Sequence, residues 1–181
     1  MKIQTPRLIL TKVVAEDADA VHALHLLPET DQYNTLGIPE NKAQTEKLVA
    51  EWIAANQESS PQKYTLRITD HNNLFVGLIG IKMGKPTYRI AEIWYKLHSS
   101  HWNKGYATEA LNGVLEFCFN ELELHRIEAG CAVENIASAK VLEKAGFLRE
   151  GRHRKILPIR GQWHDNFSYA ILEEDFANQK R

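Results

Sequence analysis

A short run of small and polar residues, between an aromatic-rich segment and an amphipathic one, is the part of this sequence best suited to chemistry. Residues 102–110 read WNKGYATEA and follow a strand-like segment at residues 90–97. The first turn of a helix has backbone N–H groups without partners and the positive end of the helix dipole, so a phosphate can bind there through the backbone alone. Gly105 lets the main chain approach such a ligand, and Lys104 adds a positive charge. Spacing alone leaves two interpretations open, a site for a phosphate-bearing ligand or a structural helix start.

The segments around this turn predict strands and helices that alternate along a single domain, residues 1–181. Seven strands are predicted from alternating or short apolar runs at residues 7–14, 63–69, 74–83, 88–97, 125–133, 147–157 and 163–172. Helices are predicted at residues 16–27, 41–58, 107–122 and 135–146. Asn41 and Asn135 are the expected N-caps, and residues 28–39 are expected to be irregular. This order describes a mixed sheet flanked by helices, in an α+β or α/β domain.

Composition and charge narrow the classes of partner. The formal net charge of -1 gives no bulk attraction to nucleic acid or acidic membranes, and no apolar run approaches the roughly 20 residues of a membrane span. Cys118 and Cys131 are expected to be small buried apolar groups. The N-terminus lacks the apolar core of a signal peptide, so a cytoplasmic location is expected. No spacing of His, Cys, Asp and Glu resembles a ligand set, so no metal is expected.

Four separated motifs resemble those of the GNAT N-acetyltransferases, and most closely the Rim-type branch, which acetylates protein N-termini. They are TPRLIL at residues 5–10, the turn at residues 102–110, NIAS and LEKAGF within residues 135–147, and GQWHD at residues 161–165. The motifs cover nearly the whole chain in the order typical of the family. The resemblance implies an α+β fold of the α/β/α type, with helices flanking a mixed, mostly antiparallel sheet of seven strands. It also implies acetyl-CoA as the acetyl donor.

The resemblance places acetyl-CoA along the 102–110 turn and the strand before it. In the family the turn reads Gln/Arg-x-x-Gly-x-Gly/Ala and its backbone amides bind the pyrophosphate. The corresponding residues are Asn103, Lys104, Gly105, Tyr106, Ala107 and Thr108. Trp102 and Asn103 depart from the common pattern, which removes a side-chain contact but leaves the amides in place.

The strand before the turn is implied to pair with the pantetheine arm of acetyl-CoA. In the family this strand diverges from its neighbour, which here implies contacts from Tyr95, Lys96 and Leu97. A backbone N–H near Leu97 would polarise the thioester carbonyl. The alternative for these three residues is an ordinary strand end.

The departing thiolate needs a proton, so the reaction needs an acid. The resemblance implies that the helix after residue 135 supplies it. Other GNAT branches use a Tyr in this helix, and Leu142 stands at that place here. In the Rim branch a Ser one turn into the helix is the acid or a cofactor contact, which corresponds to Ser138. The alternative for Ser138 is a helix-start serine that only bonds the backbone. Asn135 is expected to contact the cofactor arm as well as cap the helix.

Glu92 is the carboxylate best placed to take a proton from the acceptor amine. Strand alternation puts it on the same face as Trp94 and Lys96, opposite Tyr95 and Leu97. On that face it meets either an acceptor groove or bulk solvent. Five histidines are candidates by pKa alone, namely His25, His98, His101, His125 and His164.

Two classes of function remain open at this level. The first is an acetyl-CoA-dependent N-acetyltransferase that acts on a primary amine, such as a protein N-terminus or a small amine. The second is a domain that binds acetyl-CoA or a partner without catalysis, because the usual Tyr is missing and the turn is altered. The basic stretch at residues 149–160 suits either an acidic acceptor or a solvated strand edge, and Asp165 is expected to hold this hairpin. An exposed hairpin here would support a homodimer.

Overall fold

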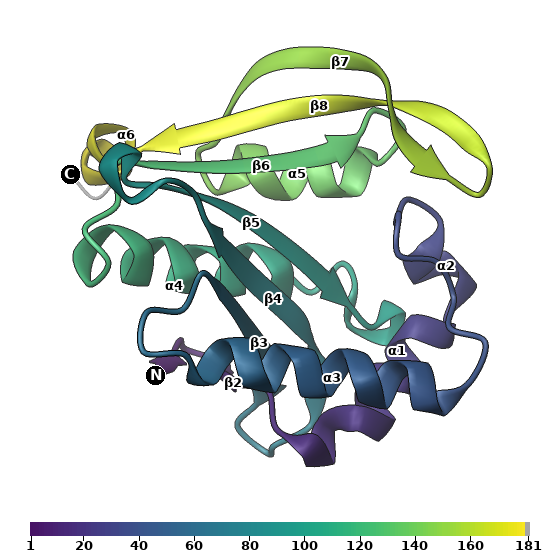
Figure 1. Cartoon of the computed structure of the whole chain (residues 1–181). Helices are drawn as coiled ribbons and strands as arrows, with labels where there is room; N and C mark the ends of the chain where they lie inside the picture. The colour runs from purple at the N-terminus through teal and green to yellow at the C-terminus, as the bar shows by residue number, and fades with distance from the viewer. Residues whose placement is uncertain (180–181) are drawn as a thin grey trace.

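The computed structural model describes residues 1–179, which form one eight-stranded sheet covered by helices (Figure 1). The strands are β1 (Lys2–Gln4), β2 (Leu8–Lys12), β3 (Lys63–Asp70), β4 (Phe75–Met83), β5 (Ile90–Leu97), β6 (Arg126–Ala132), β7 (Leu148–Ile159) and β8 (Gln162–Leu172). Their order across the sheet is β1-β2-β3-β4-β5-β6-β8-β7. Neighbouring strands are antiparallel except β5 and β6, which are parallel. The predicted mixed, mostly antiparallel sheet is therefore confirmed.

The predicted count of seven strands is wrong by one, because the prediction omits β1. This strand has only three residues, of which Ile3 is half-buried and the flanking two are exposed. It pairs with the outer edge of β2, where Ile3 lies opposite Leu10. Three residues are too few to show the alternation by which the other strands are predicted from sequence.

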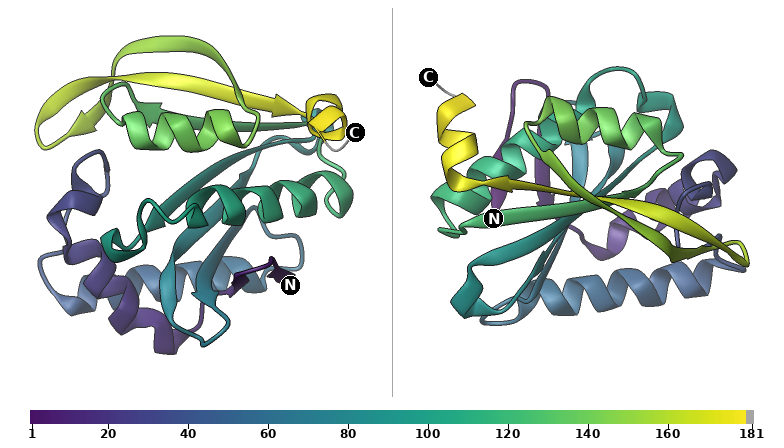
Figure 2. Two further views of the ribbon diagram at one scale, coloured as in Figure 1. Left: turned by 180° about the vertical axis from the view of Figure 1, so that it is seen from behind. Right: turned by 90° about the horizontal axis from the view of Figure 1, so that it is seen from above.

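The helices lie on both faces of the sheet. They are α1 (Ala18–Leu26), α2 (Pro28–Asp31), α3 (Lys42–Gln57), α4 (Tyr106–Asn120), α5 (Ile136–Lys144) and α6 (Glu173–Gln179). Figure 2 shows α4 and α5 on one face and α1 and α3 on the other. Two of these helices differ from the predictions, because α2 occupies part of the stretch expected to be irregular and α6 follows the last predicted strand. Within residues 1–179, no helix is long and apolar enough to cross a membrane.

Two apolar clusters hold the faces of the sheet in place. The larger one lies under α4 and α5 and includes the buried side chains of Leu111 and Leu142. The smaller one lies under α1 and α3 and includes Leu24, Val49 and Leu78. Each large apolar side chain buried in this way contributes about 1.5–3 kcal/mol to the stability of the fold. These contacts hold the helices against both faces of the central strands.

The pairing between β5 and β6 covers only part of their length. Residues 90–92 of β5 lie opposite residues 126–128 of β6, and beyond these pairs the two strands diverge (Figure 1). β6 pairs with β8 along its whole length, and β5 stays paired with β4 up to Leu97. Both α4 and α5 begin on the side where β5 and β6 end and lie farthest apart (Figure 1). The sheet therefore opens into a wedge between two helix N-termini.

Candidate active site

The backbone of β5 presents polar groups to this wedge. His98 donates its backbone N–H to Val76 at 2.9 Å, and Gly84 donates to the Ile90 carbonyl at 2.8 Å, while the register of β5 on β4 is regular in between. In an antiparallel pair the bonded residues alternate, so the even-numbered residues of β5 bond to β4. The N–H and C=O groups of Tyr95 and Leu97 therefore point to the side that β6 has left. An extended ligand could add to β5 at these two residues, which are two of the three for which the family resemblance implies contacts with the pantetheine arm.

Lys96 differs from its two neighbours, because the same alternation directs its backbone groups to Leu78 of β4. Its predicted contact with the pantetheine arm is thus not supplied by backbone hydrogen bonds. The Lys96 side chain lies on the opposite face of the sheet from Tyr95 and Leu97, which both pack with the cluster under α4 and α5. The strand alternation in the sequence predicts the same division of β5, with Lys96 on one face and Tyr95 and Leu97 on the other.

Trp102 closes the end of the wedge nearest the 102–110 turn. Its indole Nε1 donates a hydrogen bond to the Leu97 carbonyl at 2.9 Å. This bond occupies the carbonyl group of Leu97 and does not involve its backbone N–H. The residue that departs from the family pattern therefore ties the turn to the end of β5. This contact gives Trp102 a structural role in place of the side-chain contact to a ligand that it lacks.

The 102–110 turn has the backbone geometry that a phosphate site requires. Asn103 and Gly105 both have positive φ, 59° and 78°, and α4 begins at Tyr106 with no side-chain cap from Gly105. The first N–H groups of the helix are thus not bonded by a capping side chain, and left-handed residues in the turn aim successive N–H groups at one point. A Cβ at Gly105 would lie 3.4 Å from Nη2 of Arg7.

An ion-pair network that the sequence analysis did not identify holds this turn. Glu109 of α4 accepts from Thr5 Oγ1 at 2.6 Å, from the Arg7 N–H at 2.8 Å and from Arg7 Nε at 2.6 Å. Arg7 also donates to the Lys104 carbonyl at 3.0 Å and lies over the ring of Tyr106, with Cζ 4.7 Å from the centroid. Burial alone would raise the pKa of Glu109, but the hydrogen bonds from Thr5 and Arg7 lower it. The TPRL motif thus anchors the turn, although its partner is 102 residues away in the chain.

Replacing Arg7 with Gln is expected to raise the KM for acetyl-CoA about 10-fold, equivalent to about 1.4 kcal/mol. The reason is that the turn would lose the bonds to the Lys104 carbonyl and to Glu109, and its N–H groups would no longer be held in one arrangement. Arg89→Gln is the matched control, because Arg89 is about as exposed and forms an ion pair with Glu173 at 3.3 Å, outside the turn. Steady-state kinetics with varied acetyl-CoA measures both. Equal KM values for the two variants would contradict a positioning role for Arg7.

Ser138 and Tyr95 meet across the wedge. The Tyr95 hydroxyl lies 2.9 Å from Ser138 Oγ and donates to the Ser138 carbonyl at 3.2 Å. Asn135 caps α5 by accepting from the Ser138 N–H at 3.1 Å, as predicted. Burial raises the pKa of Tyr95 well above its usual range, so its hydroxyl stays protonated. The family position for a catalytic Tyr holds Leu142, which is buried in the core, but a Tyr hydroxyl reaches Ser138 from β5 instead.

Cys131 lies beside this pair and does not compete for its role. Burial raises the pKa of its thiol to about 11, so it stays protonated at neutral pH. Cys131 and Cys118 are both buried free thiols, as the sequence predicts.

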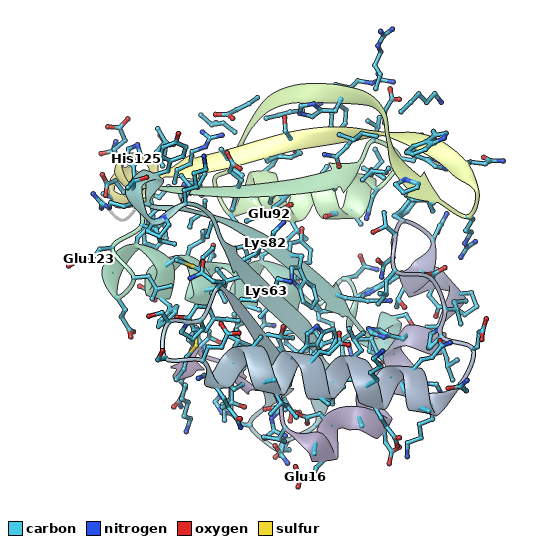
Figure 3. The ribbon with its side chains drawn as sticks, in the orientation of Figure 1. Glu16, Lys63, Lys82, Glu92, Glu123 and His125 are labelled. Carbon is cyan, nitrogen blue, oxygen red and sulfur yellow. The ribbon has the colours of Figure 1, made fainter. Side chains whose placement is uncertain are left out.

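Glu92 lies on the other face of the sheet from Ser138. Its carboxylate is 55% exposed and lies 3.8 Å from Nζ of Lys82, and Figure 3 shows the two side chains close together. Trp94, on the same face, lies flat over β4, where a Cβ on Gly80 would collide with the indole. Glu92 is three residues from Tyr95, about 10 Å along the strand. The structure therefore does not bring the two predicted catalytic residues together, and a proton could pass from the wedge to Glu92 only through water.

Two further candidates, Asp165 and His125, form ion pairs away from the wedge. Asp165 accepts from Arg152 Nε at 2.7 Å and from the Lys155 N–H at 2.9 Å within the β7–β8 hairpin, and these bonds lower the pKa of its carboxyl. His125 lies 3.1 Å from Glu173 at the opposite end of the sheet from the turn (Figure 3). Among residues 1–179, no three His, Cys, Asp or Glu side chains gather where they could hold a metal ion.

Residues 7–148 match the family model of the acetyltransferase (GNAT) domain. The chain belongs to the GNAT acetyltransferase family. The uncharacterized N-acetyltransferase YnaD of Bacillus subtilis (strain 168) is 33% identical over 177 residues, which are 97% of this chain and 99% of that protein. This GNAT protein is thus an acetyl-CoA-dependent N-acetyltransferase, and its wedge and turn are the parts of the fold suited to acetyl-CoA.

Two further relatives of this GNAT protein have named acceptors. The putative ribosomal N-acetyltransferase YdaF of Bacillus subtilis (strain 168) is 35% identical over 104 residues, 58% of this chain and 57% of that protein. The crystal structure of spermidine N-acetyltransferase from Vibrio cholerae in complex with CoA and spermine has a TM-score of 0.83 at 25% identity, and the match covers 94% of this chain and 98% of that one.

Proposed function

We propose that this protein acetylates a primary amine, with a protein N-terminal amine as the first candidate, by direct attack of the amine on the thioester of acetyl-CoA. The observation that carries this proposal is the wedge between β5 and β6. Three features near this wedge support the proposal, namely the N–H groups of Tyr95 and Leu97, the start of α4 without a side-chain cap, and the Tyr95–Ser138 pair.

Each part of the site has a separate task in this proposal. The backbone of the turn binds the pyrophosphate, through Asn103, Lys104, Gly105, Tyr106, Ala107 and Thr108. Tyr95 and Leu97 bind the pantetheine arm from β5, and Asn135 contacts it from the start of α5. The Leu97 N–H stabilises the oxyanion that forms when the amine nitrogen attacks the carbonyl carbon.

Proton transfer completes the exchange of the C–S bond for a C–N bond. Ser138 donates its hydroxyl proton to the departing thiolate and regains one through the Tyr95 hydroxyl, which takes a proton from solvent in the same step and so stays neutral, as its high pKa requires. Glu92 accepts the amine proton through water, from the face of the sheet that bears α1 and α3. The acid and the base thus act from opposite faces of β5.

Two relatives frame the choice of acceptor. YdaF is named as a putative ribosomal N-acetyltransferase, and the Vibrio cholerae enzyme acts on spermidine. The Rim-type motifs favour a protein N-terminus for this chain. An association of two copies through the exposed β7–β8 hairpin stays a prediction.

The proposal is tested by measuring CoA release from acetyl-CoA with a panel of peptides, polyamines and small amines, for the wild type and Glu92→Gln. We expect turnover with at least one acceptor and a loss of about 10-fold in kcat/KM for Glu92→Gln. This loss is smaller than the roughly 100-fold or more that is typical of a general base, because the carboxylate is exposed and acts through water. Glu16→Gln, on a distant exposed residue, is the control (Figure 3). If acetyl-CoA binds but no acceptor in the panel accelerates CoA release, the protein is a binding domain and the proposal fails.

A further inference from the structure

A polar cluster lies against the end of β5, on the face opposite Tyr95 and Leu97. We call His25 of α1, Asp31 of α2, Lys96 of β5 and Arg160 of the β7–β8 turn the acceptor-side cluster. Arg160 is brought there by a two-residue turn, in which Arg160 and Gly161 both have positive φ, 49° and 75°. The hairpin tip and α2 lie close together (Figure 1), and Arg160 donates to the Pro28 carbonyl at 3.3 Å. The cluster thus brings together segments that are distant in the chain. It lies beside the end of β5, next to Leu97.

Two opposite charges in this cluster have unused hydrogen-bonding atoms. Within the described part of the chain, Nζ of Lys96 and Oδ1 of Asp31 are buried and have no hydrogen-bond partner. The Asp31 side chain is only 4% exposed. A buried polar atom without a partner costs about 1–3 kcal/mol, and more for a charged group, so two such atoms in one cluster call for an explanation.

Arg160 explains why the two charges do not satisfy each other. It donates to Oδ2 of Asp31 from Nη2 at 3.2 Å and from Nε at 3.4 Å, which holds the carboxylate toward the hairpin. Among residues 1–179, no ion pair within 4.0 Å joins Lys96 to Asp31. Burial lowers the pKa of Lys96 to about 8, while the charge of Asp31 acts in the opposite direction. The charge of Asp31 therefore acts on Lys96 although no hydrogen bond joins the two side chains.

We propose that Asp31 and Lys96 recognise the acceptor as a pair, with Asp31 Oδ1 accepting an N–H of the acceptor amine and Lys96 Nζ donating to an oxygen beside that amine. The fragment that offers an N–H donor and an oxygen acceptor on adjacent carbons is an α-amino carbonyl group. The acceptor is then an amino acid, an amino amide or a peptide N-terminus. This inference rests on the proposed function, since it assigns the acceptor of that reaction.

The charges of the cluster disfavour a polyamine. The carboxylate of Asp31 is already paired with Arg160, and Lys96 adds a second cation. Burial, and next the charge of Lys96, lower the pKa of His25 to about 4, so His25 is neutral at pH 7. Within the acceptor-side cluster, a second ammonium group of a polyamine would meet Lys96, and the one carboxylate of the cluster is already paired with Arg160. Lys96 instead requires an oxygen, and its flexible stem can follow one as the acceptor enters.

The test compares L-alaninamide with isopropylamine, which has the same carbon skeleton at the amine but no carbonyl group. The quantity measured is the ratio of their kcat/KM values for the wild type, Lys96→Met, Asp31→Asn and the exposed control Lys63→Met. Comparing the ratio between variants cancels the different basicity of the two amines. We expect Lys96→Met to lower the ratio about 10-fold or more, and Asp31→Asn to lower kcat/KM for both amines with little change in the ratio. Lys63→Met is expected to match the wild type.

Acetyl-CoA kinetics and direct binding keep the outcomes distinct. An unchanged KM for acetyl-CoA shows that each variant is folded. Calorimetry with CoA-loaded protein measures binding of the two amines without turnover, so the recognition pair can be tested even if the protein acetylates neither. An unchanged ratio in Lys96→Met, or binding of alaninamide no tighter in the wild type than in Lys96→Met, overturns the inference. A wild type that prefers spermidine to alaninamide overturns it as well, while leaving the proposed acetyl transfer intact.

Discussion

Gly105→Val is expected to raise the Kd for acetyl-CoA at least about 100-fold. Gly105 has a φ of 78°, a left-handed conformation that a β-branched residue adopts only with strain, and a Cβ there would lie 3.4 Å from Nη2 of Arg7. The turn would have to change its path to accept Val, which removes several N–H contacts at once. Isothermal titration calorimetry with acetyl-CoA, or with CoA as the product, measures the loss.

Gly37→Val is the matched control for this result. Gly37 has nearly the same φ, 79°, and a Cβ there would meet nothing within 4 Å, so the variant carries a similar backbone strain away from the turn. We expect a lower Tm for both variants and weaker binding of acetyl-CoA for Gly105→Val alone. Retained binding by folded Gly105→Val would show that the turn does not hold the pyrophosphate.

Ser138→Ala is expected to lower kcat about 100-fold with a change of no more than about 3-fold in the KM for acetyl-CoA, because it removes the donor to the departing thiolate. The substitution leaves the cap of α5 intact, since Asn135 bonds to the backbone N–H of Ser138 and not to its hydroxyl. Pre-steady-state measurement of acetyl transfer separates the chemical step from product release.

Tyr95→Phe completes this experiment. We expect a smaller loss, because Ser138 keeps its own proton while Tyr95 only replaces it. If Ser138→Ala changes the KM for acetyl-CoA and leaves kcat unaltered, Ser138 is a cofactor contact and the thiolate takes its proton from water. Tm values for both variants show whether the core under α5 is preserved.

The elements around the site could be predicted from sequence because their signals are local. The alternation of β5 places Glu92, Trp94 and Lys96 on one face, and the Asn135 cap forms the hydrogen bond expected of its residue type. Gly105 also has the left-handed conformation that suits a glycine at a strand-to-helix turn. Each of these features depends on backbone geometry over a few residues. Short elements such as β1 and α2 have too few residues to show such a pattern, so the sequence does not predict them.

Local sequence patterns are thus sufficient to predict the family, the start of α4 and the two faces of β5. They do not predict which side chains of distant segments are in contact. Tyr95 and Ser138 are 43 residues apart, Arg7 and Glu109 are 102 apart, and Asp31 and Arg160 are 129 apart. Periodicity states which face of an element is buried but not which residue of another element packs against it, because that depends on the register and divergence of whole strands. The separation of β5 from β6 after Glu92 is such a property, and it creates the site.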